Sequence, residues 1–236
     1  MEIRNKLSII IPTLNEEKTL GQLLTQLHEY AAGVPHEVIV VDAESIDRTR
    51  EIALQHAARV LVTEPGRGGQ LNRGTACATG EVLWFLHADS KLDRECIPKL
   101  LEKIGTGIKG GCFQIRFRDP RLAYRVIAWG SNIRAKRFKS FYGDQGIFVE
   151  RELFQSLGGF PELPIMEDLE FSRRLYRKAA AVETVEATIW TSPRRFRKGI
   201  LKTLLLMQAL KIAYFCKVDP FILAKVYGAG KKTSFD

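Results

Sequence analysis

Cysteine is scarce in this 236-residue chain, which has four such residues: Cys77, Cys96, Cys112 and Cys216. No two of them are close in the sequence, and there is no CxxC pair or Cys/His cluster. This spacing argues against the disulfide framework of a small secreted domain and against a zinc site. It favours the reducing cytoplasm as the location of the protein.

From its apolar segments we expect neither a signal peptide nor a membrane span. The apolar run near the N-terminus is short and ends at Pro12. Residues 200–216 are strongly apolar, but Lys202 and Lys211 interrupt a segment that is already too short to cross a bilayer. Two interpretations are open: a helix in the membrane interface with its lysines at the headgroups, or a core or dimer helix.

Acidic residues are few toward the C-terminus. Residues 1–169 hold 22 basic and 22 acidic residues, whereas residues 170–236 hold 14 basic and five acidic ones, which accounts for the net charge of +9. Such a segment can meet anionic lipid, nucleic acid or a phosphorylated substrate, or it can be a solvated face. Nucleic acid is the least favoured partner, because few aromatic side chains accompany the basic ones to stack on bases.

The first hundred residues alternate short apolar runs, typical of buried strands, with helical patterns. This order predicts an α/β fold with a mostly parallel, Rossmann-like central sheet and helices on both faces. We expect strands at residues 7–12, 37–41, 60–63 and 82–86, and helices at residues 19–31, 47–56 and 70–78. Asn15 is a plausible N-cap for the first helix.

The second half is less regular. It predicts strands at residues 110–117 and 146–149, and helices at residues 122–139, 151–157, 167–178 and 200–216. A single domain over residues 1–236 is the simplest organisation. Within it we expect a nucleotide-binding half (1–90), an acceptor and catalytic half (91–197) and a basic, apolar helical segment (198–236).

Polar or glycine-rich residues follow four successive predicted strands. In such sheets ligands bind beyond the carboxyl ends of the strands, so these residues are expected to form one continuous cleft. They are Pro12, Thr13, Asn15 and Glu16 after the first strand, Asp42 and Ser45 after the second, Gly66, Arg67 and Gln70 after the third, and His87, Ala88 and Asp89 after the fourth.

The residue types in this cleft suit a nucleotide diphosphate. Asp42 can accept a hydrogen bond from a base or a ribose hydroxyl, and Gly66 lets the backbone approach an anion while Arg67 adds positive charge. Asp89 can ligate a divalent ion, which commonly binds through one or two carboxylates and the phosphates of a substrate. A single aspartate after a strand is more often a helix cap, so the prediction depends on the joint placement of these residues.

Five segments together resemble glycosyltransferase family 2, which has the GT-A fold. They are SIIIPTLNEEKTL, VVDAESIDRT, GRGGQLNRGTACATGEVLWFLHADS, GDQGIFVERELFQSLGGF and PIMEDLEFSRRL. The resemblance covers most of the chain, is specific for fold and reaction class, and is uninformative about the sugar. The His-Ala-Asp form and the RRFRKG segment are most similar to a small bacterial subgroup known as "transferase 2".

The resemblance implies a role for each matching position. Asp168 would be the catalytic base, with Glu167 beside it, and Asp89 would ligate Mn²⁺ or Mg²⁺. Nucleotide contacts would come from Pro12, Thr13, Asn15, Glu16, Asp42, Ser45, Gly66, Arg67, Gln70, His87 and Ala88. Gly143, Asp144, Gln145 and Gly146 would shape the acceptor site, and Arg194 or Arg195 would face the diphosphate.

Three positions depart from the family pattern. Ala43 replaces the second aspartate of an Asp-Asp pair, and His87 replaces the first aspartate of the metal motif. A neutral imidazole can contact ribose or ligate manganese better than magnesium, or His87 is simply a satisfied strand-end histidine. The family's QxxRW element is absent as such, and Arg194 and Arg195 are expected in its region.

The resemblance implies an inverting transfer of a sugar from a UDP- or GDP-sugar to an acceptor hydroxyl. The basic helix at 122–139 and the apolar, basic C-terminus suggest a lipid or another amphiphile as acceptor, and a peripheral position at the inner face of a membrane. Two rival functions are a nucleotidyltransferase of related fold and a non-catalytic nucleotide-binding or membrane-associated scaffold. The oligomeric state is not predicted.

Overall fold

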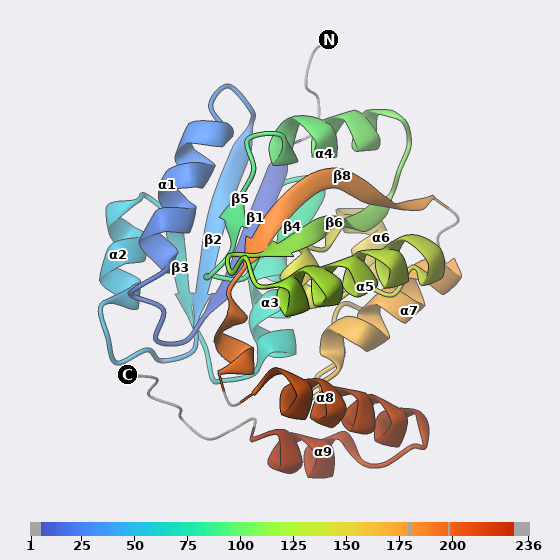
Figure 1. Ribbon diagram of the computed structural model, residues 1–236. Coiled ribbons are helices and arrows are strands. Elements are labelled where there is room, and N and C mark those ends of the chain that lie inside the picture. Colours follow the sequence, from blue (N-terminus) through green and yellow to red (C-terminus); the bar gives the residue numbers. More distant parts are fainter. Residues whose placement is uncertain (1–5, 179–180, 198, 229–236) are drawn as a thin grey trace.

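The computed structural model describes residues 6–178, 181–197 and 199–228. Its centre is an eight-stranded sheet in the order β3-β2-β1-β4-β7-β6-β8-β5 (Figure 1). All pairings are parallel except those of β7 with its two neighbours and of β5 with β8. The strands are β1 (Leu7–Thr13), β2 (His36–Asp42), β3 (Arg59–Val62), β4 (Val82–Phe85), β5 (Lys91–Leu92), β6 (Gly110–Phe117), β7 (Phe148–Glu150) and β8 (Val182–Thr191).

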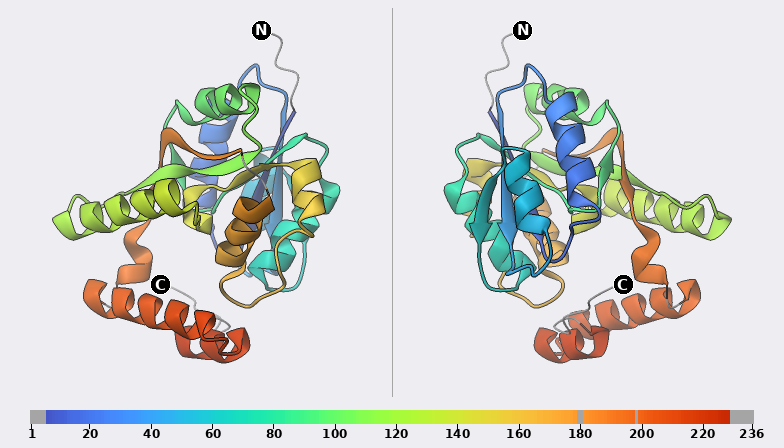
Figure 2. Two further views of the ribbon diagram at one scale, coloured as in Figure 1. Left: turned by 90° about the vertical axis from the view of Figure 1, so that its right-hand side faces the viewer. Right: turned by 90° about the vertical axis from the view of Figure 1, so that its left-hand side faces the viewer.

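Helices cover both faces of this sheet (Figure 2), which confirms the predicted α/β architecture. One face carries α1 (Leu20–Tyr30), α2 (Thr49–Gln55) and α4 (Cys96–Gly105), and the other carries α3 (Arg67–Cys77), α6 (Arg151–Ser156) and α7 (Glu167–Lys178). In β1, Ile9 and Ile11 enter one core and Ile10 enters the other. Because both faces are covered, the inner strands are continuous apolar runs rather than alternating ones.

Three helices lie outside these two layers. Helix α5 (Leu122–Phe138) runs along β6, and α8 (Ile200–Phe215) and α9 (Pro220–Tyr227) form a hairpin. In Figure 2, α5 and α8 project from the same side of the molecule. Leu210 and Leu223 of the hairpin pack on Ile165, in the segment that leads into α7. Within the described ranges, no helix combines the length and the apolarity that crossing a membrane requires.

The sequence prediction was wrong at the start of α1. The helix begins at Leu20 with Thr19 before it, so Asn15 is not its N-cap. Instead, Asn15 adopts a left-handed conformation, with φ of 54°, and its side-chain oxygen accepts a hydrogen bond from the Ile46 backbone at 3.0 Å. Asn15 therefore joins the loops that follow β1 and β2. The sequence analysis also missed α4, α9 and the ten-residue strand β8.

Candidate active site

The loops after β1 and β2 form one hydrogen-bonded unit around Asp42. This carboxylate is fully buried and accepts hydrogen bonds from the Thr13 hydroxyl at 2.9 Å and from the Ser45 backbone at 2.8 Å. The Ser45 hydroxyl donates to Asp42 at 2.5 Å and accepts from the Asn15 backbone at 2.8 Å. Asp42 thus fixes the floor of the cleft, and its predicted contact with a base stays a prediction.

Gln70 has a structural role at the same edge. Its amide nitrogen donates to the backbone oxygens of Thr13 and Val41, at 3.1 Å and 2.8 Å, and its side chain is buried. Both amide hydrogens are then used within the protein, because a side-chain amide carries two donors. This geometry leaves Gln70 no donor for a ribose or a phosphate. Ala43 is buried too, and its backbone continues the β1–β2 pairing at 2.9 Å from the Thr13 oxygen.

Arg194 links two of the predicted ligand-binding carboxylates. It lies in the short 3₁₀ helix Pro193–Phe196, which follows β8. Its Nε is 3.0 Å from Oδ2 of Asp89, and its terminal nitrogens donate to Glu16 at 2.6 Å and 3.0 Å. The Asp89 side chain is 6% exposed, whereas that of Arg194 is 44% exposed. One guanidinium therefore pairs with both acids from the open side of the cleft.

Arg67 makes a similar pair on the other side of the cleft, with Glu167 at 3.2 Å. Glu167 is buried, and this burial raises the pKa of its carboxyl against the opposing charge of Arg67. The neighbouring Asp168 accepts a hydrogen bond from the Gly143 backbone at 2.8 Å. Both acids begin α7, where the helix dipole favours negative charge. Met166, just before them, has a strained φ of 67°, a feature that often marks functional sites.

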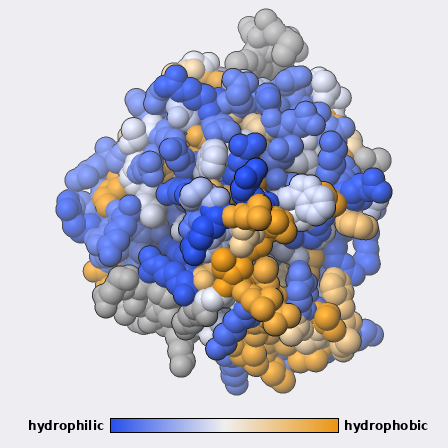
Figure 3. All heavy atoms as spheres, in the orientation of Figure 1, coloured by the Kyte–Doolittle hydropathy of each residue, from blue (hydrophilic) through white to orange (hydrophobic). Residues whose placement is uncertain are grey.

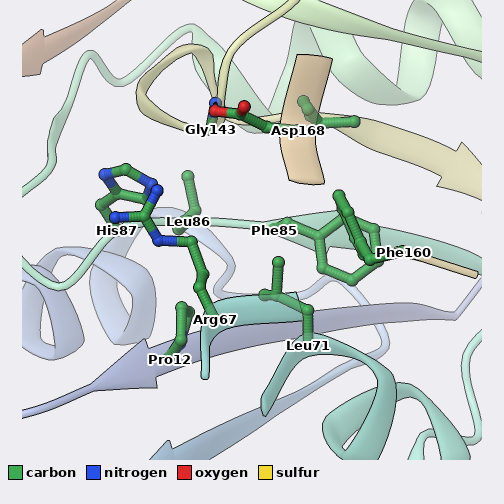
Figure 4. Close-up of a pocket in the computed structure, with 10 residues that line it drawn as sticks. Pro12, Arg67, Leu71, Phe85, Leu86, His87, Gly143, Phe160 and Asp168 are labelled. Carbon is green, nitrogen blue, oxygen red and sulfur yellow. Dashed lines mark hydrogen bonds between the residues drawn. The ribbon is translucent and has the colours of Figure 1, made fainter. Parts of the chain in front are cut away.

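His87 lies between these elements and lines a small pocket with Arg67, Gly143 and Asp168 (Figure 4). Burial and the positive charges of Arg67, Arg195 and Arg194 place the pKa of its imidazole well below the usual value. Its Nε2 is buried and finds no hydrogen-bond partner among the described residues. The interpretation of His87 as a satisfied strand-end histidine is therefore wrong. His87 thus presents a buried ring nitrogen that no described residue satisfies.

Gly143 allows this close approach. A Cβ atom at this position would lie 2.6 Å from Nε2 of His87 and 3.5 Å from Oδ2 of Asp168. Any side chain would therefore push the 3₁₀ helix Gly143–Gln145 away from the strand end that carries His87. Gly146 is equally restricted, because its φ is 60° and a Cβ would lie 2.3 Å from Ile189. Both glycines set the shape of the predicted acceptor turn.

Within that turn, Asp144 and Gln145 have different surroundings. Gln145 is buried, and its side-chain oxygen accepts from Arg134 at 2.9 Å, so its role is structural. Asp144 has one buried oxygen without a hydrogen-bond partner in the described structure, and burial raises the pKa of its carboxyl. Arg134 lies 3.7 Å above the Tyr142 ring. Arg134 and Tyr142, missed by the sequence analysis, hold the turn, and their only signal was proximity to the predicted acceptor motif.

The pocket at the centre of the cleft is nearly filled by side chains in this conformation. The pocket between His87 and Asp168 has a volume of about 10 Å³, which is close to the minimum for one water molecule. A ligand larger than one water molecule can enter this pocket only if side chains move. Arg67 and Arg194 are the candidates to move, because the side chains of both are more than 40% exposed and each forms an ion pair with an acid of the cleft.

The donor set for a divalent ion is small. No group of three or more His, Cys, Asp and Glu side chains that could hold a metal occurs in the part of the chain that is described. Asp89 offers a buried carboxylate, and His87 offers an orphaned nitrogen. These groups fit an ion that is held by one or two protein ligands and completed by the phosphates of a substrate. Arg194 already pairs with Oδ2 of Asp89 and would compete with such an ion for this carboxylate.

The structure thus brings most of the predicted residues to one edge of the sheet. Glu16, Arg67, His87, Asp89, Asp168 and Arg194 present side chains to the cleft, and Pro12 and Gly143 line it. Asp42, Ser45, Gln70 and Gln145 are buried beneath it, and Ala88 is buried as well. Gly66 precedes α3 with a φ of 158° and open space around it. Arg195 is near enough to affect the pKa of Asp144 and His87.

Comparisons with known sequences agree with this arrangement. The sequence profile of glycosyl transferase family 2 matches residues 8–182. A dolichol-phosphate mannosyltransferase of Pyrococcus furiosus is 35% identical over 43% of this chain, but the match spans only 31% of that enzyme. A PGL/p-HBAD biosynthesis glycosyltransferase of Mycobacterium bovis is 28% identical over 86% of this chain and 82% of its own length.

Solved structures share the fold. Glucosyl-3-phosphoglycerate synthase of Mycobacterium tuberculosis, in complex with Mn²⁺, UDP and glucosyl-3-phosphoglycerate, superposes with a TM-score of 0.61 at 23% identity. The match covers 78% of this chain and 71% of that one.

Proposed function

The chain belongs to glycosyl transferase family 2, and we propose that it moves a sugar from a nucleoside-diphosphate donor to an acceptor hydroxyl with inversion. The observation that carries this proposal is the juxtaposition across the cleft. The α7 carboxylates, anchored by Gly143 and Arg67, face the strand ends that hold His87 and Asp89. A candidate base and a candidate diphosphate site therefore flank one pocket.

Asp168 is the proposed base. The Gly143 N–H bond holds Oδ2, and a carboxylate oxygen keeps a second lone pair for an acceptor hydroxyl. Asp168 takes the proton while the acceptor oxygen bonds to the anomeric carbon. The bond from that carbon to the phosphate oxygen breaks, and the nucleoside diphosphate leaves. Glu167 is held by Arg67 and positions this end of α7.

The diphosphate would lie at the opposite side of the cleft. A divalent ion on Asp89, with His87 as a further ligand or ribose contact, would supply Lewis-acid stabilisation of the leaving group. Arg194 and Arg67, once released from their acids, would donate to the phosphate oxygens in a forked geometry. Uridine and manganese are the first choices to test, since the M. tuberculosis structure was solved with UDP and Mn²⁺.

A thermal-shift screen of sugar nucleotides with Mn²⁺ and Mg²⁺ tests the donor site. Stabilisation by one nucleotide diphosphate, larger with metal than with EDTA, is the expected result. Product analysis then separates the rival functions. Release of a nucleoside diphosphate supports glycosyl transfer, release of pyrophosphate supports a nucleotidyltransferase, and binding without slow donor hydrolysis supports a scaffold.

For the acceptor, we propose an amphiphile that is presented at a membrane surface, with the enzyme as a peripheral protein. The support is the apolar and basic character of α5 and of the C-terminal hairpin, which flank the acceptor turn. Mass spectrometry of products from a lipid extract incubated with the identified donor tests this part. An exclusively water-soluble acceptor would contradict it.

A further inference from the structure

Exposed hydrophobic side chains gather on two regions that are far apart in the sequence. Of the nineteen large hydrophobic residues exposed in the described ranges, five lie on α5 and nine lie within residues 201–227. Figure 3 shows hydrophobic side chains that run from the level of α5 down over α8 and α9. Single exposed hydrophobic residues need no explanation, but a contiguous patch marks an interaction surface.

On α5 the exposed residues form one stripe. Leu122, Val126, Trp129 and Ile133 are spaced by four, three and four positions, which is one face of a helix. The inward face is made by other residues, including Tyr124, whereas Trp129 and Ile133 of the stripe border an open pocket at the edge of the sheet. Trp129 is 67% exposed.

The C-terminal hairpin shows the same division. Leu210 and Leu223 turn inward onto Ile165, whereas Leu201, Leu205, Ile212 and Phe215 of α8 and Phe221, Ile222 and Val226 of α9 are exposed. A mixed cluster joins the two regions, because Tyr124 of α5 packs with Phe196 and with Ile200 at the start of α8. We call α5, α8 and α9 together the apolar–basic face.

The charges on the helices of this face are almost all positive, although Lys136 of α5 pairs with Glu186 of β8 at 3.7 Å. Helix α5 contains Arg125, Arg134, Lys136 and Arg137 and no acid. Residues 200–228 contain Lys202, Lys211, Lys217 and Lys225, with Asp219 as their one acidic residue. That aspartate caps α9 through the Phe221 backbone at 2.8 Å. An isologous contact with a second copy would bring cations against cations, which is unfavourable.

We propose that the apolar–basic face docks on an anionic lipid bilayer, with the exposed side chains in the interface and the basic residues at the headgroups. Apolar helices with Lys and Arg at their borders bind anionic membranes through buried area and electrostatic attraction together. The inference deepens the proposed function, on which it rests, by naming the surface from which the acceptor comes.

The position of this face relative to the active site fits that role. Lys211 of α8 lies 5.8 Å from the ring of Tyr142, and Arg134 of α5 stacks on the same ring from the other region. Tyr142 immediately precedes the turn whose Gly143 backbone holds Asp168. An acceptor headgroup at the bilayer surface would therefore lie next to the proposed base, while its apolar part stays in the lipid.

Vesicle flotation with the full chain tests the proposal. The protein should float with vesicles of phosphatidylcholine and 30% phosphatidylglycerol at low salt, at least about tenfold more than with phosphatidylcholine alone. A triple variant, W129Q with L205Q and F221Q, should bind these anionic vesicles at least about tenfold less than the wild type does. The variant K202E with K217E should lose binding to the anionic vesicles in particular.

Two matched variants on other surfaces serve as controls. L54Q changes an exposed leucine on α2, and R73E changes an exposed arginine on α3. Both should float as the wild type does. The nucleotide-induced thermal shift is measured on every sample, so that loss of folding or of donor binding is recognised separately.

Absence of flotation with anionic vesicles at low salt would overturn the proposal, as would a triple variant that floats normally. Concentration-dependent dimerisation by light scattering, abolished in the triple variant, would assign the face to a second copy instead. Flotation without turnover of any sugar nucleotide would instead count against the proposed function alone.

Discussion

The cleft and the apolar–basic face differ in how their charged side chains are paired. In the cleft, acids already have cationic partners: Glu167 has Arg67, and Asp89 and Glu16 share Arg194. On the apolar–basic face, cations surround exposed hydrophobic side chains, and the two longer helices, α5 and α8, carry no acid at all.

This difference determines how each region can bind. A ligand that enters the cleft must exchange one set of charge partners for another, so only a ligand with matching phosphates and metal compensates for the broken pairs. A bilayer that meets the apolar–basic face removes apolar surface from water and adds attraction without first breaking a network. The paired charges of the cleft therefore suit selective binding, and the excess of cations on the face suits the proposed adsorption to a bilayer.

The sharpest way to separate the two regions is Asp168→Asn. We expect transfer to fall by about 10² to 10⁴-fold, the usual contribution of a general base. Nucleotide affinity and vesicle binding should stay at wild-type levels, because the amide keeps the size and the Gly143 contact. Steady-state kinetics, calorimetry and flotation on one preparation provide the measurement. Wild-type turnover in this variant would remove Asp168 from the base role.

Asp89→Ala tests the metal side of the cleft. Loss of the carboxylate should weaken nucleotide binding in the presence of Mn²⁺ by at least about tenfold, whereas binding in EDTA should change little. Calorimetry with UDP measures both values, and Glu64→Ala, at an exposed acid between β3 and α3, is the control. An unchanged affinity with metal present would show that Asp89 is not a ligand.

Glu37 lies near the start of β2, at the end of the sheet away from the cleft. It is an acid outside both regions, and its contribution to stability can be compared with theirs. Burial acts to raise the pKa of Glu37, but hydrogen bonds from Thr79 and Ser8 and the charge of Lys6 outweigh it and lower the pKa to about 2. The stabilisation is therefore complete above pH 4.5 and is lost as the pH falls toward 2.

Glu37→Gln should accordingly lower the free energy of unfolding by about 1–2 kcal/mol at pH 7 and by almost nothing near pH 2. Denaturant melts at a series of pH values measure this difference. A deficit that is the same at every pH would mean that packing, rather than charge, is responsible.

Arg194→Ala should have the smallest effect of these substitutions. It should change the affinities for Mn²⁺ and for UDP in opposite directions. Without nucleotide, Mn²⁺ should bind a few times more tightly, because Asp89 loses its competing guanidinium. UDP should bind a few times more weakly, because a phosphate donor is lost. Electron paramagnetic resonance of Mn²⁺ and calorimetry of UDP measure the two effects, with Arg197→Ala as the control. If both affinities stay unchanged, Arg194 is only a surface residue.

The sequence predicted the nucleotide half of the fold best. Continuous apolar runs such as residues 7–12 and 82–86 identify buried strands, because both faces of the sheet are covered. It missed α4, although Ile97, Leu100 and Ile104 have helical spacing, and β8, where Val185, Ala187 and Ile189 alternate inward. Neither α4 nor β8 carries a motif. Their apolar patterns can be interpreted only once the sheet that they cover or extend is known.

For the site, residue types and strand ends brought His87 and Asp89 together, and the family resemblance added Asp168, but neither separated ligand groups from scaffold. Gln70 and Gln145 match motif positions, yet their amides are used by backbone and Arg134. Hydrogen-bond partners of this kind come from distant segments, and spacing in the sequence does not reveal them.

The sequence by itself determined the α/β architecture, the edge of the sheet at which polar side chains gather and the acids available there, because strand order and burial follow from local patterns. Tertiary structure alone decided that Arg194 closes on Asp89 and Glu16, and that α5 and the C-terminal hairpin share one apolar, basic surface. Both results join residues more than 70 positions apart, and only packing brings such residues together.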